Sequence, residues 1–117
     1  MDFVGEFITI LSWSIYFVSP IFLVLLVSIV ILGLFAGKIE NWNKTDALYW
    51  AFITATTVGY GDHRPIKKRS KLISVLIAFL GIIFTGFIVA VTVNTATIVI
   101  DKHVEPELKE KILMDLE

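Results

Sequence analysis

Two long stretches without a charged residue constrain the fold of this chain more than any other feature. No Asp, Glu, Lys, Arg or His occurs from Phe7 to Gly37 or from Leu72 to Ile100. A helix needs about 20 apolar residues to cross the roughly 30 Å hydrocarbon core of a bilayer. With 117 residues, 56% of them hydrophobic, the chain has little polar sequence left to cover such helices in water. We therefore expect an all-α membrane protein with two transmembrane helices.

Composition excludes several other classes of protein. The chain contains no cysteine, so it has neither a disulfide framework nor a thiolate metal site. His63 and His103 lie far apart and lack the spacing of metal ligands. The net charge of −1 argues against nucleic acid as a partner.

The first apolar stretch is longer than one crossing requires. We assign residues 15–36 to an outer transmembrane helix and leave two interpretations of residues 1–14 open. In one, they form an interfacial segment with Trp13 and Tyr16 at the level of the lipid headgroups. In the other, they begin a single long, tilted helix. The second stretch, residues 72–100, predicts an inner helix.

Between the two spans, a short helix signal precedes a run of small and polar residues. Asn43 or Thr45 can cap a helix over residues 43–55, which is too short to cross a bilayer. The run TTVGYGD follows at residues 56–62. Extended backbone is tolerated at membrane depth only where protein buries it or where it lines water. We therefore expect a re-entrant pore loop.

The run TTVGYGD resembles the selectivity filter of potassium channels, and the order of elements resembles their pore domain. The preceding run ALYWAFITAT is most similar to two-helix prokaryotic channels that calcium gates through an attached cytosolic domain. The resemblance implies a homotetramer in a lipid bilayer with K⁺ as the permeant ion. It also implies that the chain is not an enzyme and uses no cofactor.

The resemblance assigns the ion-binding role to the backbone. Four copies can turn carbonyls inward in stacked rings that replace the water around K⁺. Inward carbonyls on consecutive residues need alternating backbone handedness, and glycine reaches positive φ without a Cβ clash. The ion-binding filter residues are Thr57, Val58, Gly59, Tyr60 and Gly61, with K⁺ expected at the first four. The residues expected to support the filter are Thr56, Asp62, Tyr49 and Trp50.

Two of these support roles have specific partners. Asp62 is expected to bond to Tyr49 on the pore helix, as the equivalent pair does in several members of the family. Tyr60 is expected to pack against Tyr49 and Trp50, which would hold the ring open.

Residues of the second apolar stretch are assigned to gating. Gly81 lies at the position of the family's inner-helix hinge, although close helix packing is an equal alternative, and Gly86 is a second hinge candidate. The residues expected to line the cavity and the inner gate are Thr85, Val89, Thr92, Val93 and Ala96.

The charge distribution conflicts with the orientation that the resemblance implies. Residues 38–71 carry seven basic and three acidic residues, which by the positive-inside rule would place this loop in the cytosol. The resemblance instead places it outside, with both termini cytosolic in a multi-pass protein of the cell membrane. Residues 63–71 would then form a basic outer loop, in which Arg64 is either solvated rim charge or a repellent for incoming cations.

The remaining segment, residues 101–117, is charged, and Pro106 is a candidate start of a short helix. It is either a cytosolic bundle that helps assembly or a linker to a gating domain beyond the C-terminus. Two alternative functions stay open: a weakly selective cation pore, and a non-conducting membrane anchor or assembly subunit.

Overall fold

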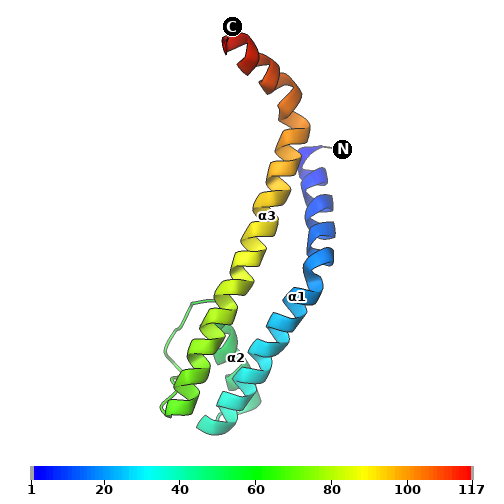
Figure 1. Ribbon diagram of the computed structural model, residues 1–117. Coiled ribbons are helices and arrows are strands. Elements are labelled where there is room, and N and C mark those ends of the chain that lie inside the picture. Colours follow the sequence, from blue (N-terminus) through cyan, green and yellow to red (C-terminus); the bar gives the residue numbers. More distant parts are fainter. Residues whose placement is uncertain (1, 117) are drawn as a thin grey trace. The chain divides into compact units, whose positions relative to one another are not determined.

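The computed structural model describes the backbone of residues 2–116 and their side chains except those of residues 104–107 and 109. Three helices make up the described chain: α1 (Phe3–Glu40), α2 (Lys44–Ala55) and α3 (Lys68–Leu116) (Figure 1). No strand occurs in this range. Two helices, Phe3–Glu40 and Lys68–His103, are long and apolar enough to span a membrane, and few of their residues are buried. These elements confirm the predicted all-α fold.

The contacts divide the chain into two compact units. The core unit is Ser19–Phe87, and the terminal unit consists of Met1–Val18 with Ile88–Glu117. In the terminal unit, His103 Nε2 lies 2.6 Å from Glu6 Oε2, and Lys102 Nζ lies 3.5 Å from Glu6 Oε1. The rings of Phe3 and His103 meet edge to face with their centroids 5.9 Å apart. The start of α1 is therefore attached to α3 by charge and ring contacts together.

α1 is longer than the predicted outer helix of residues 15–36. It runs unbroken from Phe3 through Pro20 to Glu40, so the second interpretation of residues 1–14, a single long helix, is the observed one. Asn41 then ends the helix at a φ of 61°. Trp42 N donates to Gly37 O at 2.8 Å and Asn41 N to Lys38 O at 3.4 Å. This is the Schellman pattern, in which asparagine can replace the usual glycine.

The core unit is built on close contact between α1 and α2. A Cβ added at Gly33 or at Gly37 would lie 2.5 Å from the Cβ of Ala51 or Ala47, respectively. Glycines four residues apart on α1 therefore form a flat strip on which the alanines of α2 lie. The buried residues of the core are Ile29, Ala36, Trp50, Ala51, Ala55, Ile73 and Ile77. Phe22 of α1 meets Phe84 of α3 with ring centroids 5.0 Å apart.

α3 differs from the prediction at both ends. It begins at Lys68 rather than residue 72, so the non-helical outer segment is shorter than the expected 63–71. The reason is a distant carboxylate: Glu40 Oε1 accepts from the backbone N–H groups of Ile66 and Lys67, both at 2.9 Å. At the other end, the backbone of α3 continues through residue 106 to Leu116, so no separate short helix begins at Pro106.

Candidate functional site

The candidate site is the loop of residues 56–62, which α2 holds. Asn43 caps α2, and its Oδ1 accepts from Asp46 N at 2.7 Å. Thr45, the alternative cap, lies inside the helix. α2 covers Lys44–Ala55, one residue shorter than the predicted pore helix of residues 43–55. The helix therefore ends where the candidate loop begins.

The loop folds back onto the last carbonyls of α2. Phe52 O accepts from Thr56 through both the backbone N–H, at 2.9 Å, and the hydroxyl, at 2.7 Å. Gly59 N donates to Ile53 O at 3.0 Å. These bonds satisfy carbonyls that a helix end leaves without partners. They fix the loop close to the axis of α2, and they give Thr56 its supporting position.

Backbone handedness alternates along the loop. φ is 65° at Thr57, 54° at Gly59 and 82° at Gly61, whereas Val58 and Tyr60 do not have positive φ. The two glycines behave as the sequence predicts, because they lack a Cβ. The positive φ of Thr57 was not foreseen, since a β-branched residue is strained in this region. The positive φ of Thr57 extends the alternating pattern back to the first of the expected ion-binding residues.

Asp62 and Tyr49 form a pair behind the loop. Desolvation, a hydrogen bond with Asp62 and the negative charge of Asp62 together raise the pKa of Tyr49 above its ordinary value of 10.0. Asp62 Oδ1 also accepts from the backbone N–H of His63 at 3.1 Å. The hydroxyl of Tyr49 therefore links α2 to the end of the loop.

His63 lies beside a carboxylate and two aromatic rings, and sequence reasoning missed these contacts. Its Nε2 lies 3.6 Å from Asp46 Oδ1, and its ring centroid is 5.5 Å from that of Trp42 and 6.3 Å from that of Tyr49. Trp42 belongs to the turn after α1, and Asp46 to the first turn of α2. Only folding brings these three segments together, so local sequence gave no signal for the contact.

The packing of Tyr60 against Tyr49 and Trp50 of the pore helices stays a prediction for the assembled channel. The side chain of Tyr60 makes no ring contact with the described residues, and Tyr60 is 72% exposed. Trp50 is buried instead against Trp42, with ring centroids 5.2 Å apart. Within one chain, Trp50 thus has its aromatic partner in the turn after α1.

Arg64 is exposed and contacts the candidate loop. Its Nε donates to Gly61 O at 3.1 Å, and its guanidinium lies against Gly61. The side chain therefore holds a loop carbonyl, and both interpretations of its charge stay predictions. Gly61 is the last of the five expected ion-binding residues.

The expected gating residues all belong to α3. Gly81 is buried against the end of α2, where an added Cβ would clash with the carbonyl oxygen of Ala55, whereas nothing lies within 4 Å of one at Gly86. Close packing thus explains Gly81 without a hinge. Thr85, Val89 and Val93 are exposed, Thr92 and Ala96 are half-buried, and α3 is continuous through all of them.

The described residues contain no group of three or more His, Asp or Glu side chains arranged to hold a metal ion. The oxygens that the loop offers are instead backbone carbonyls and the hydroxyl of Thr57. Such neutral oxygens suit a weakly held ion that must also leave.

Comparisons with known proteins match both the loop and the helices around it. A family described as "Ion channel" matches residues 4–97. The TWiK family of potassium channels protein 7 of Caenorhabditis elegans is 41% identical over 69 residues, which are 56% of this chain and 12% of that protein. Potassium voltage-gated channel subfamily A member 5 of Oryctolagus cuniculus is 45% identical over 49 residues, which are 42% of this chain and 8% of that protein.

A third relative, potassium voltage-gated channel subfamily A member 4 of Homo sapiens, is 37% identical over 62 residues, or 53% of this chain and 10% of that protein. The chain thus spans about a tenth of the length of these relatives. No solved structure matches it.

Proposed function

The chain belongs to the ion channel family, and from this premise we propose that four copies form a potassium-selective pore that conducts K⁺ passively down its electrochemical gradient. The family and the two long apolar helices indicate a multi-pass membrane protein that is a channel and not an enzyme. The printed names of the relatives are those of potassium channels, which supports K⁺ as the ion.

The alternating φ values of the 56–62 loop are the single observation that carries this proposal. Positive φ at Thr57, Gly59 and Gly61 rotates alternate peptide groups, so that consecutive carbonyls can be turned to one side of the loop. One chain supplies one side of an ion's surroundings, and a cyclic tetramer would close the cage. K⁺ would then exchange its water for carbonyl oxygens from four chains, with the hydroxyl of Thr57 as a further ring.

The same proposal includes an orientation. With the 56–62 loop at the outer mouth, both termini face the cytosol, against the positive-inside count. We give the resemblance of the loop greater weight than the charge count. The positive-inside rule is statistical, whereas the architecture of a channel fixes the side on which its pore loop lies. The resemblance to calcium-gated channels makes a cytosolic regulatory domain after α3 one expected source of gating, and a cytosolic bundle that helps assembly is the alternative role of residues 101–117.

Ion flux in liposomes tests the proposal. We expect purified chain to pass K⁺ but not Na⁺ when each gradient is applied in turn. Flux of both ions would show a weakly selective pore, and flux of neither would show an anchor or assembly subunit. Either result would overturn the proposal.

The variant Gly59→Ala tests whether the loop backbone carries this flux. A Cβ at a φ of 54° is strained although nothing lies within 4 Å of it. We therefore expect tetramers that form normally and K⁺ flux that is abolished. Unchanged flux in Gly59→Ala would show that the backbone of this loop does not line the path of the ion.

A further inference from the structure

We propose that His63 is a positioning residue for ion binding, whose imidazole ring braces Tyr49 and thereby holds the end of the 56–62 loop in the form that binds K⁺. The inference rests on the proposed function, because it concerns how the loop keeps its ion-binding form. It adds a residue that is neither an expected ion ligand nor an expected support of the filter. His63 directly follows the loop, and only 27% of its side chain is exposed.

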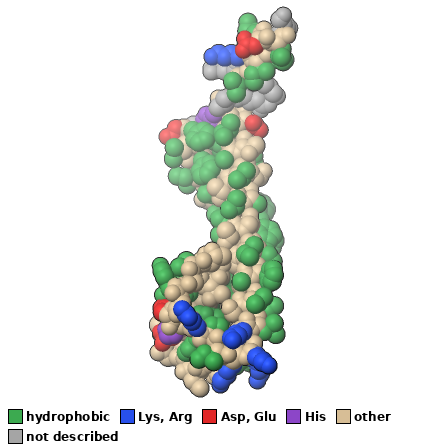
Figure 2. All heavy atoms as spheres, turned by 90° about the vertical axis from the view of Figure 1, so that its left-hand side faces the viewer, with side chains coloured by type: hydrophobic (Ala, Val, Ile, Leu, Met, Phe, Trp, Pro, Cys, Tyr) green, Lys and Arg blue, Asp and Glu red, His purple; other side chains and the backbone are tan. Residues whose placement is uncertain are grey.

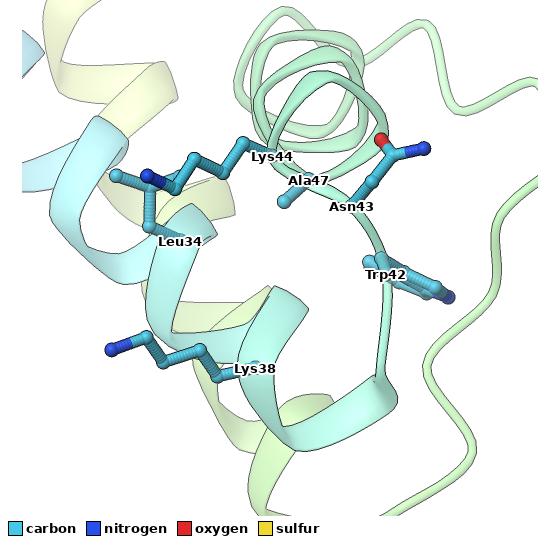
Figure 3. Close-up of a pocket in the computed structure, with 6 residues that line it drawn as sticks. All are labelled: Leu34, Lys38, Trp42, Asn43, Lys44 and Ala47. Carbon is cyan, nitrogen blue, oxygen red and sulfur yellow. The ribbon is translucent and has the colours of Figure 1, made fainter.

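The imidazole ring of His63 contacts aromatic rings from two other segments. It meets the ring of Trp42 at a centroid distance of 5.5 Å and that of Tyr49 at 6.3 Å, with interplanar angles of 68° and 77°. Both contacts are edge to face, an arrangement that aromatic pairs prefer. The ring of Trp42 points away from Lys38 and Lys44 (Figure 3). His63 therefore joins the turn after α1 to the middle of α2.

Trp42 gives the imidazole ring a fixed support. Its backbone N–H donates to Gly37 O at 2.8 Å, and its ring packs on that of Trp50 with centroids 5.2 Å apart. Trp50 is 3% exposed and belongs to the core, against which Trp42 packs. A side chain whose neighbours are locked by packing can hold a functional group at a defined position. The contact with Trp42 therefore lets His63 resist movement of Tyr49.

Tyr49 passes this support on to the end of the loop. Its hydroxyl is hydrogen-bonded to Asp62, whose Oδ1 also accepts from the backbone N–H of His63 at 3.1 Å. The three residues thus form a closed circuit, which we call the Tyr49–Asp62–His63 circuit. Asp62 directly follows Gly61, the last expected ion-binding residue. Without the imidazole ring, Tyr49, which is 39% exposed, could turn away from Asp62 and release the end of the loop.

The polar contact of His63 is the weaker part of its surroundings. Its Nε2 lies 3.6 Å from Asp46 Oδ1, and 40% of the Asp46 side chain is exposed. Ion pairs at exposed positions contribute little to stability. We therefore assign the positioning role to the ring of His63 and not to its nitrogen atoms. His63→Phe keeps a ring at this position, whereas His63→Asn keeps a polar group and removes the ring.

Thermal unfolding of the full chain in detergent, with K⁺ exchanged for Na⁺ at constant ionic strength, measures ion binding without conduction. An ion that binds only the folded protein stabilises it in proportion to its affinity. We expect K⁺ to stabilise the parent chain more than Na⁺ does. His63→Ala and His63→Asn should need about fivefold more K⁺ for the same stabilisation, the change that corresponds to one lost aromatic pair. His63→Phe should stay within about twofold of the parent chain.

Phe22→Ala is the matched control for a general loss of stability. It removes ring contacts with Phe84 and Phe87, which involve none of the residues of the Tyr49–Asp62–His63 circuit. This variant should unfold at a lower temperature and still show the K⁺ dependence of the parent chain.

Amide hydrogen exchange measures the brace itself and needs no bound K⁺. In Na⁺ alone, residues 59–63 should exchange faster in His63→Ala than in the parent chain, because the loop end opens locally more often. The exchange in His63→Phe should match that of the parent chain.

Three results would overturn the inference. The first is a His63→Ala variant with the K⁺ dependence and the exchange rates of the parent chain. The second is a His63→Phe variant as impaired as His63→Ala, which would assign the role to the nitrogen atoms. The third is the same shift in K⁺ dependence in Phe22→Ala, which would indicate general stability. A parent chain that K⁺ stabilises no more than Na⁺ would contradict the proposed function, and the exchange rates would then decide the bracing role.

Discussion

At the scale of single residues, the loop is fixed by contacts from α2 and from the turn that follows the loop. The carboxylate of Asp62 is held by Tyr49 from α2, and the carbonyl of Gly61 by Arg64 from the following turn. Gly59 N bonds to Ile53 O at the end of α2. The unusual backbone of residues 57–61 is thus over-determined by its surroundings, as strained segments at functional sites usually are.

Tyr49→Phe should remove a tyrosine titration that is displaced to higher pH. Because the pKa of Tyr49 is raised in the folded protein, the proton on its hydroxyl stabilises the fold fully below pH 10, and this contribution is lost as the pH rises through the raised value. Ultraviolet titration would show a transition above pH 10 in the parent chain and its absence in Tyr49→Phe. If that transition persists in the variant, it does not belong to Tyr49.

At the scale of elements, the contacts between helices depend on glycines, and the junction between α1 and α3 depends on the carboxylate of Glu40. Gly33 and Gly37 allow α2 to lie on α1, and Gly81 allows the end of α2 to lie on α3. Glu40 joins the end of α1 to the chain that enters α3. Lys67 reinforces the joint, because its Nζ donates to Ile39 O at 2.8 Å.

Gly81→Ala and Gly86→Ala should differ in stability. The first places a methyl group against the carbonyl of Ala55 and should destabilise the fold by about 1–3 kcal/mol, the usual cost of overpacking. The second meets open space and should be neutral or slightly stabilising, since alanine is the better helix former. Thermal unfolding in detergent measures both. Normal stability of Gly81→Ala together with altered gating would favour the hinge interpretation over close packing.

Glu40→Ala should loosen the junction between α1 and α3. The variant leaves the N–H groups of Ile66 and Lys67 without their acceptor, so we expect faster amide hydrogen exchange across residues 66–70. Glu40→Gln keeps one side-chain oxygen and should show a smaller increase. Equal exchange in Glu40→Ala and the parent chain would mean that this carboxylate does not secure the start of α3.

At the scale of the whole molecule, the chain exposes much apolar surface in both of its units. Exposed side chains include Val58 and Tyr60 in the core unit and Val89 and Val93 in the terminal unit. Basic side chains gather at the end of the core unit, where α1 ends and α3 begins (Figure 2). Lipid can cover the apolar surface of the outer helices, whereas a loop at membrane depth needs protein or water around it.

Mass measurement of the purified chain in detergent tests the assembly. We expect four copies of the 13.2 kDa chain, because a ring of loop carbonyls with cyclic symmetry needs one loop from each copy. Tyr60→Asp should leave that mass unchanged while it admits Na⁺, since the ring of carbonyls above Thr57 would lose a supporting aromatic residue. A monomer or dimer that still conducts K⁺ would contradict the fourfold cage.

The sequence by itself determined the class of the protein, the three helices and the place of the loop. Apolar length decided the spans, a cap residue decided the start of α2, and the lack of a Cβ decided where φ turns positive at Gly59 and Gly61, because each of these effects is local. Only the tertiary structure decided the partners of Glu40 and His63 and the packing role of Gly81. Those contacts join segments far apart along the chain or depend on helix rotation, and no local pattern encodes them.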